Sequence, residues 1–89
     1  MYRVLIVEDD PMVASIDRSY VERTADFTVV AVCKNGEEAL EYLRGEQVDL
    51  IIADIKMPVV TGLELLEKIR GEKISDAHFV ILSGYADFE

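Results

Sequence analysis

The sequence predicts an α/β domain, a parallel sheet with helices on both of its faces. Four short apolar runs show no alternation of apolar and polar residues, so both faces of each strand are expected to be buried, as is typical of parallel sheets. The segments between these runs have helical periodicity, and parallel strands need such crossover helices. A length of 89 residues leaves room for one domain.

The first apolar run, Arg3–Val7, is a predicted strand. After it, Asp10 and Pro11 are typical of the N-cap and the first position of a helix. The apolar residues that recur at helical spacing in this helix are Val13, Ile16 and Tyr20. The face that they form is expected to be buried.

The second run, Phe27–Cys33, is rich in β-branched residues and predicts the second strand. Asn35 followed three residues later by Glu38 is a capping-box pattern, and Gly45 is expected to end the helix that begins there. The apolar stripe of this helix consists of Ala39, Leu40 and Leu43.

The third strand is predicted over Leu50–Ala53 and stops at Asp54. A loop over Ile55–Val60 follows, and Thr61–Glu64 is a further capping-box pattern that begins the third helix. The residues of this helix that are expected to face inward are Leu65, Leu66 and Ile69. The fourth strand is predicted over His78–Leu82.

The composition excludes several kinds of partner. Asp and Glu number 18 against 9 Lys and Arg, and the net charge of -9 repels nucleic-acid phosphates and anionic membrane surfaces. The apolar runs are far shorter than the roughly 20 residues that span a bilayer. The single cysteine, Cys33, cannot form an internal disulfide and is expected to be a buried strand thiol. We therefore expect a reduced, soluble, cytoplasmic domain that binds neither DNA nor membranes.

Polar residues follow three of the predicted strands. Glu8 and Asp9 come after the first strand, Asp54 after the third and Ser83 after the fourth. The carboxyl ends of parallel strands share one edge of a sheet, where ligands bind, so these side chains are expected to converge. Carboxylates held close together raise the energetic cost of ionisation, and a bound cation removes that conflict. A site with oxygen ligands alone favours Mg²⁺ when a phosphate is also bound.

Asp54 is the predicted nucleophile of this site. One of its carboxylate oxygens can attack a phosphoryl group in line while Mg²⁺ offsets the developing charge. Glu8 and Asp9 are predicted to hold the metal, whereas a helix N-cap already explains Asp10. His78 precedes the fourth strand and is expected to be solvated rather than a metal ligand.

The runs Val4–Asp10, Asp54–Pro58 and Val80–Gly84, together with Gly62, resemble the receiver domain of two-component response regulators in order and spacing. The resemblance implies a flavodoxin-like sheet with strand order 2-1-3-4 and a phosphoacceptor signalling domain rather than an enzyme. It also implies a sensor histidine kinase as partner and a transcriptional output in the parent protein.

The resemblance further implies a role for each site residue. Asp54 would accept the phosphoryl group, and Ser83 would contact a phosphoryl oxygen and relay the switch. Asp9 and Asp54 would bind Mg²⁺ directly, Glu8 would act through water, and Lys56 would contribute its backbone carbonyl.

Receivers of this family continue with a further helix, a fifth strand that carries a phosphate-pairing Lys, and a last helix. The sequence of residues 1–89 contains none of these, so we interpret it as a C-terminally incomplete receiver domain. Phosphorylation-driven switching is therefore expected to be impaired. Apolar surface around Ile16 and Tyr20, and the edge of the fourth strand, should then be uncovered, which predicts self-association through that edge.

Three alternatives remain open at this point. An interaction module could keep the fold after losing phosphotransfer. An aspartate-nucleophile phosphohydrolase would need a second acid at the position of Lys56. A nucleotide or flavin binder would need a Gly- or Ser-rich loop where Glu8 and Asp9 repel phosphate.

Overall fold

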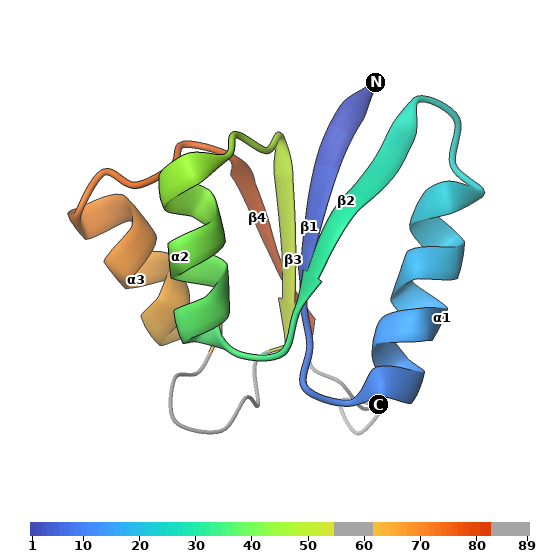
Figure 1. Cartoon of the computed structure of the whole chain (residues 1–89), viewed down its shortest axis with the longest axis horizontal. Coiled ribbons are helices and arrows are strands. Elements are labelled where there is room, and N and C mark those ends of the chain that lie inside the picture. Colours follow the sequence, from blue (N-terminus) through green and yellow to red (C-terminus); the bar gives the residue numbers. More distant parts are fainter. Residues whose placement is uncertain (55–61, 83–89) are drawn as a thin grey trace.

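A computed structural model describes residues 1–54 and 62–82 of the chain. These residues form one parallel sheet in the order β2-β1-β3-β4, with α1 on one face and α2 and α3 on the other (Figure 1). The strands are β1 Tyr2–Val7, β2 Phe27–Cys33, β3 Leu50–Asp54 and β4 His78–Leu82. The helices are α1 Pro11–Glu22, α2 Gly36–Gly45 and α3 Gly62–Gly71. The predicted α/β class and the strand order 2-1-3-4 are confirmed.

The strand registers bring the carboxyl ends of the strands to one edge of the sheet. Val7 of β1 pairs with Cys33 of β2 on one side and with Ala53 of β3 on the other. Asp54 pairs with Leu82 of β4. The three predicted acids of the site therefore follow or end two neighbouring strands, β1 and β3.

The core has one layer on each face of the sheet. Successive strand residues point to opposite faces. Leu5 and Val7 of β1 therefore pack in the layer beneath α2 and α3, whereas Val4 and Ile6 pack on the α1 side. All four side chains are completely buried. Burial on both faces explains why the first apolar run does not alternate with polar residues.

Helices α2 and α3 bury most of the apolar stripes that their periodicity predicts. The buried apolar side chains of these two helices are those of Ala39, Leu40, Leu43, Leu65 and Ile69. Leu66, also expected to face inward, is only partly buried. No helix within the described residues has the length and apolar character needed to cross a membrane.

The two helix caps that lie within the described residues are present. Asp10 accepts a hydrogen bond from the Met12 N–H (2.9 Å), and Asn35 accepts one from the Glu38 N–H (2.8 Å). The Glu38 carboxylate in turn accepts from the N–H of Lys34, one residue before the cap, rather than from the cap itself (2.9 Å). The predicted cap at Thr61 lies outside the described residues.

The predicted buried face of α1 is wrong for its two largest residues. Ala14 and Val21 are buried against the sheet, whereas Ile16 is 50% exposed and Tyr20 is 64% exposed. Ile16 and Tyr20 lie about 200° and 240° around the helix axis from Ala14, at 100° per residue, so they cannot contact the same surface. Their exposure agrees with the expectation of uncovered apolar surface around them.

The end of α3 is a Schellman motif with a lysine in the position that favours glycine. The N–H of Ile74 donates to the carbonyl of Ile69 (2.9 Å), and the N–H of Lys73 donates to the carbonyl of Arg70 (3.2 Å). Lys73 has a φ of 56°, in the left-handed region that a side chain with a Cβ adopts at an energetic cost.

Lys73→Gly is expected to raise the free energy of unfolding by about 0.5–1 kcal/mol, because relief of the left-handed strain exceeds the extra entropy of an unfolded glycine. Lys73→Ala is the matched control, since it removes the charge and the long side chain but keeps the Cβ. Urea unfolding of the three proteins measures the difference. An alanine variant as stable as the glycine variant would show that backbone strain is not the cause.

Candidate functional site

The candidate site lies at the carboxyl edge of the sheet, the lower edge in Figure 1. Glu8 and Asp9 directly follow β1, and Asp54 ends the adjacent strand β3. The pairing of Val7 with Ala53 places Glu8 and Asp54 at corresponding positions on two strands that run roughly 5 Å apart. The structure thus brings the backbones of the three predicted acids together. The Asp54 side chain, Lys56 and Ser83 lie outside what the structure describes.

The two adjacent acids have different environments. Glu8 is buried, with 5% of its surface exposed, and its carboxylate accepts a hydrogen bond from the Asp10 N–H (3.1 Å). The backbone N–H of Glu8 donates to the carbonyl of Cys33 on β2 (2.8 Å). Asp9 is exposed. A buried carboxylate needs such hydrogen bonds to remain in place, so Glu8 is a fixed group and Asp9 an accessible one.

The end of β2 lies beside the loop that follows β1. Cys33 is buried, as expected, and burial raises the pKa of its thiol to about 11, with a further contribution from the negative charge of Glu38. A neutral, buried thiol packs in the core and is a poor nucleophile. Lys34, the next residue, is exposed at the same edge as the acids. Its position follows from the strand order, but no motif in the sequence indicates a role for it.

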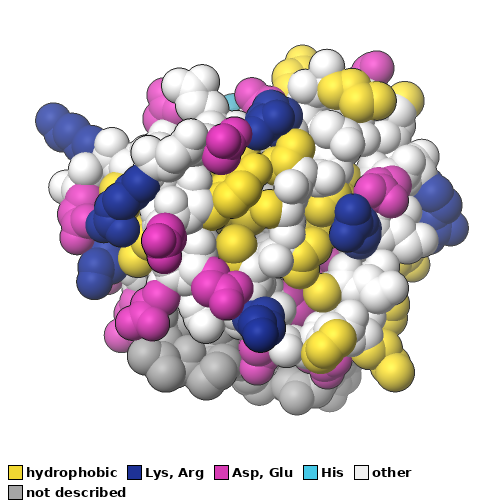
Figure 2. All heavy atoms as spheres, in the orientation of Figure 1, with side chains coloured by type: hydrophobic (Ala, Val, Ile, Leu, Met, Phe, Trp, Pro, Cys, Tyr) yellow, Lys and Arg dark blue, Asp and Glu magenta, His cyan; other side chains and the backbone are white. Residues whose placement is uncertain are grey.

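Acidic side chains are numerous on this side of the molecule. Figure 2 shows acidic side chains over the whole visible face, several of them on its lower part. Glu37 and Glu38 in the first turn of α2 add to the acids that follow β1. Among the side chains that the structure describes, which do not include that of Asp54, no three His, Cys, Asp or Glu gather closely enough to hold a metal by themselves. The described carboxylates of the predicted metal site are therefore Glu8 and Asp9.

These residues fit a hard cation better than any other group. The donor set that follows β1 and ends β3 consists of carboxylate oxygens, without imidazole or thiolate. One member, Glu8, is already held in a fixed position by hydrogen bonds, and another, Asp9, is open to solvent. His78 begins β4 at the opposite end of the strands and is exposed, as predicted, so it does not belong to this site.

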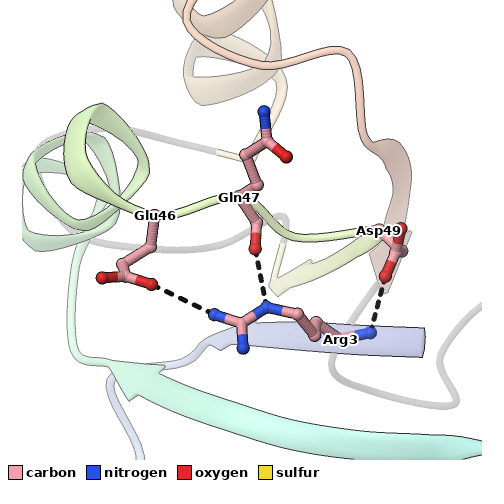
Figure 3. A network of polar contacts seen from close by, with 4 residues as sticks. All are labelled: Arg3, Glu46, Gln47 and Asp49. Carbon is pink, nitrogen blue, oxygen red and sulfur yellow. Dashed lines mark hydrogen bonds and ion pairs between the residues drawn. The ribbon is translucent and has the colours of Figure 1, made fainter. Parts of the chain in front are cut away.

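A hollow of about 940 Å³ lies at the amino ends of the strands, away from the acids. Arg3 forms part of its wall and anchors the loop before β3 (Figure 3). Its side chain donates to the carbonyl of Gln47 (2.8 Å) and the carboxylate of Glu46 (3.2 Å), and its backbone N–H donates to Asp49 (2.8 Å). Sequence patterns do not reveal this network, because its partners are more than 40 residues from Arg3 along the chain.

Arg70 anchors the loop before β4 in a similar way. Its two terminal nitrogens donate to the carbonyl oxygens of Ser75 (2.8 Å) and Ala77. Both arginines that line the hollow are thus engaged in holding loops against the sheet. The hollow is a product of these two loops, and the chemistry that the sequence predicts lies at the other edge.

Residues 4–89 match the family described as the response regulator receiver domain. The chain belongs to this family. The receiver is 35% identical over 88 residues to the probable C4-dicarboxylate response regulator DctR of Bacillus subtilis, a match that covers 99% of the chain and 38% of DctR. It is 42% identical over 85 residues to the transcriptional regulatory protein CitT of Halalkalibacterium halodurans, covering 93% of the chain and 36% of CitT. The receiver thus spans well under half the length of these curated relatives.

Solved receivers share the fold. The N-terminal domain of a response regulator receiver protein from Methanoculleus marisnigri matches with a TM-score of 0.85 and 30% identity, over 96% of this chain and 68% of that one. The regulator TrrA crystallised with the histidine kinase ThkA matches with a TM-score of 0.81 and 32% identity, over 100% of this chain and 74% of that one. TrrA from Thermotoga maritima with Mg(2+)-BeF matches with a TM-score of 0.76 and 27% identity, over 99% of this chain and 92% of that one.

Family membership identifies the chain as a receiver of two-component signalling, a signalling domain rather than an enzyme. The resemblance inferred from the acidic run after β1 and the Asp54 and Ser83 motifs is confirmed at the level of the family. The roles of the individual site residues remain predictions.

Proposed function

We propose that this receiver accepts a phosphoryl group on Asp54. The observation that supports the proposal best is the register of β1 with β3, which puts Asp54 beside the acidic pair Glu8 and Asp9 at one edge of the sheet. In the transfer, a carboxylate oxygen of Asp54 attacks phosphorus, an O–P bond forms, and the bond from phosphorus to the histidine nitrogen of the donor breaks. The imidazole leaves with its electron pair and takes up a proton.

The chain's own residues prepare this step. Asp54 has to be ionised to act as a nucleophile, and two neighbouring carboxylates oppose its ionisation. Glu8, Asp9, Asp54 and the backbone carbonyl of Lys56 would hold Mg²⁺, which supplies positive charge against both the acids and the incoming phosphoryl oxygens. Ser83 would donate a hydrogen bond to a phosphoryl oxygen and so communicate phosphorylation to the surface.

We infer that the phosphoryl donor is a sensor histidine kinase and that the parent protein controls transcription. TrrA, a solved relative, was crystallised with the kinase ThkA, and CitT is named a transcriptional regulatory protein. We place this exchange in the cytoplasm, where an unpaired thiol such as Cys33 stays reduced.

Incubation with a small phosphodonor tests the proposal. The wild-type chain is expected to gain the mass of one phosphoryl group when Mg²⁺ is present, and to gain little when the metal is chelated. A folded chain that takes up no phosphoryl group with Mg²⁺ would instead support the reading of an interaction module without phosphotransfer.

Asp9→Asn is expected to remove the stabilisation that Mg²⁺ gives to the fold. In the wild type, Mg²⁺ at ten times its Kd should raise the free energy of unfolding by about 1.4 kcal/mol, because the metal binds the native state and relieves carboxylate repulsion. Thermal unfolding with and without Mg²⁺ measures the gain, with Asp49→Asn at the opposite edge as the control. An Asp9→Asn protein that responds as strongly as the wild type would exclude Asp9 as a ligand.

We also propose that a polypeptide of residues 1–89 self-associates through the outer edge of β4. Among the described strands β4 pairs with β3 alone, its segment Phe79–Leu82 carries no charge, and Val80 is 41% exposed. Uncharged strand edges pair readily with other chains. Light scattering of the wild type should give a mass above that of the monomer. Val80→Lys places a charge on this strand and should lower the measured mass toward that of the monomer. A wild type that is monomeric at every concentration would contradict the proposal.

A further inference from the structure

The acidic loop consists of residues 8–10, between β1 and α1. Asp10 links this loop to α1 through three hydrogen bonds. Its carboxylate accepts from the Met12 N–H (2.9 Å), and its carbonyl accepts from the Ala14 N–H (2.9 Å), so the residue is tied to the start of α1. Its own N–H donates to the carboxylate of Glu8 (3.1 Å). One residue thus joins the helix end to the buried acid of the candidate site.

The loop between β1 and α1 is fixed at both of its ends. At the strand end, the Glu8 N–H donates to the carbonyl of Cys33. At the helix end, Pro11 occupies the first helical position, where its ring restricts φ to the helical value. Asp9 is the residue between these anchors, and its side chain is exposed. The position of Asp9 therefore depends on anchors made by other residues.

We propose that Asp10 is a positioning residue that holds Glu8 and Asp9 ready for a divalent cation without binding the cation itself. The inference rests on the proposed function for the identity of the cation, Mg²⁺. An N-cap fixes the backbone at Asp10, and that backbone places the N–H that holds the Glu8 carboxylate. When the cap is lost, the loop has to be ordered at the moment of binding, which lowers affinity.

Three variants separate capping from charge and from general stability. Asp10→Ala removes both the cap and the charge, whereas Asp10→Asn removes the charge but keeps a side-chain oxygen that caps equally well. Asn35→Ala removes the equivalent cap of α2, which bonds the Glu38 N–H and not the acidic loop. Each substitution is made in the polypeptide of residues 1–89.

The first measurement is a titration with Mg²⁺ alone, at a temperature at which every variant is folded. Asp10→Ala should bind Mg²⁺ about three- to tenfold more weakly than Asp10→Asn, from the typical effect of losing a cap. Asn35→Ala should bind with the affinity of the wild type. Equal affinities of Asp10→Ala and Asp10→Asn would overturn the proposal, because charge alone would then explain any change.

The second measurement is amide hydrogen exchange without metal. The N–H groups of residues 10 and 12 should exchange faster in Asp10→Ala than in the wild type and should remain protected in Asp10→Asn. Unchanged protection in Asp10→Ala would overturn the positioning role. A wild type that binds no Mg²⁺ would refute the proposed metal site, and the exchange rates would still decide whether Asp10 orders the loop.

Discussion

Asp54→Asn is expected to abolish phosphoryl uptake completely. The amide has nearly the shape of the carboxylate, but it carries no negative charge and is not a nucleophile. Asp54 ends β3, in the centre of the sheet beside β1, so no other residue of β3 can replace it at that edge. Intact-mass measurement after incubation with a small phosphodonor and Mg²⁺ should show one added phosphoryl group in the wild type and none in Asp54→Asn.

Asp49→Asn is the matched control for this substitution. Asp49 immediately precedes β3 at the opposite edge, and there its side chain accepts a hydrogen bond from the Arg3 N–H, which an amide oxygen can also accept. This variant should be labelled to the same extent as the wild type. Equal labelling of Asp54→Asn and the wild type would refute Asp54 as the acceptor.

Leu65→Ala is expected to have the largest effect on stability. Leu65 lies on α3, has no exposed surface, and packs in the core layer between that helix and the sheet. Truncating such a side chain lowers the free energy of unfolding by about 3–5 kcal/mol, because apolar burial is lost and a cavity remains. Small domains have about 5–15 kcal/mol in total, so the variant should be close to unfolding at room temperature.

Leu63→Ala provides the control on the same helix. Leu63 is 52% exposed, so its truncation removes little buried surface and should change the free energy of unfolding by about 0.5 kcal/mol or less. Urea unfolding followed by circular dichroism compares the two variants. A similar loss of stability in both would mean that α3 does not pack on the sheet through the face that contains Leu65.

The local elements could be predicted from the sequence because their signals are local. The strands are recognisable as short apolar runs, and the caps at Asp10 and Asn35 precede their helices directly. The carboxyl edge could also be predicted, since parallel strands end on one side and the acids follow them. The strand order required the resemblance to receivers, because periodicity alone does not specify which strands are neighbours.

Other features depend on contacts that sequence patterns do not contain. The periodicity of α1 indicated a helix but not its packed stripe, which the small Ala14 forms together with Val21, while Ile16 and Tyr20 stay exposed. The two acids Glu8 and Asp9 are adjacent and chemically alike, yet Glu8 is buried and accepts a hydrogen bond from the Asp10 N–H, whereas Asp9 is exposed. These outcomes follow from the path of the backbone in three dimensions.

Locating the phosphoryl group on the chain is the measurement that decides most directly whether the acidic edge accepts it. Borohydride reduces an aspartyl phosphate to homoserine, and peptide sequencing by mass spectrometry then identifies the modified residue. Homoserine is expected at position 54 alone, in samples labelled with Mg²⁺ present. Homoserine at position 9 or 10, or label only on Ser or His side chains, which borohydride does not reduce, would contradict Asp54 as the acceptor.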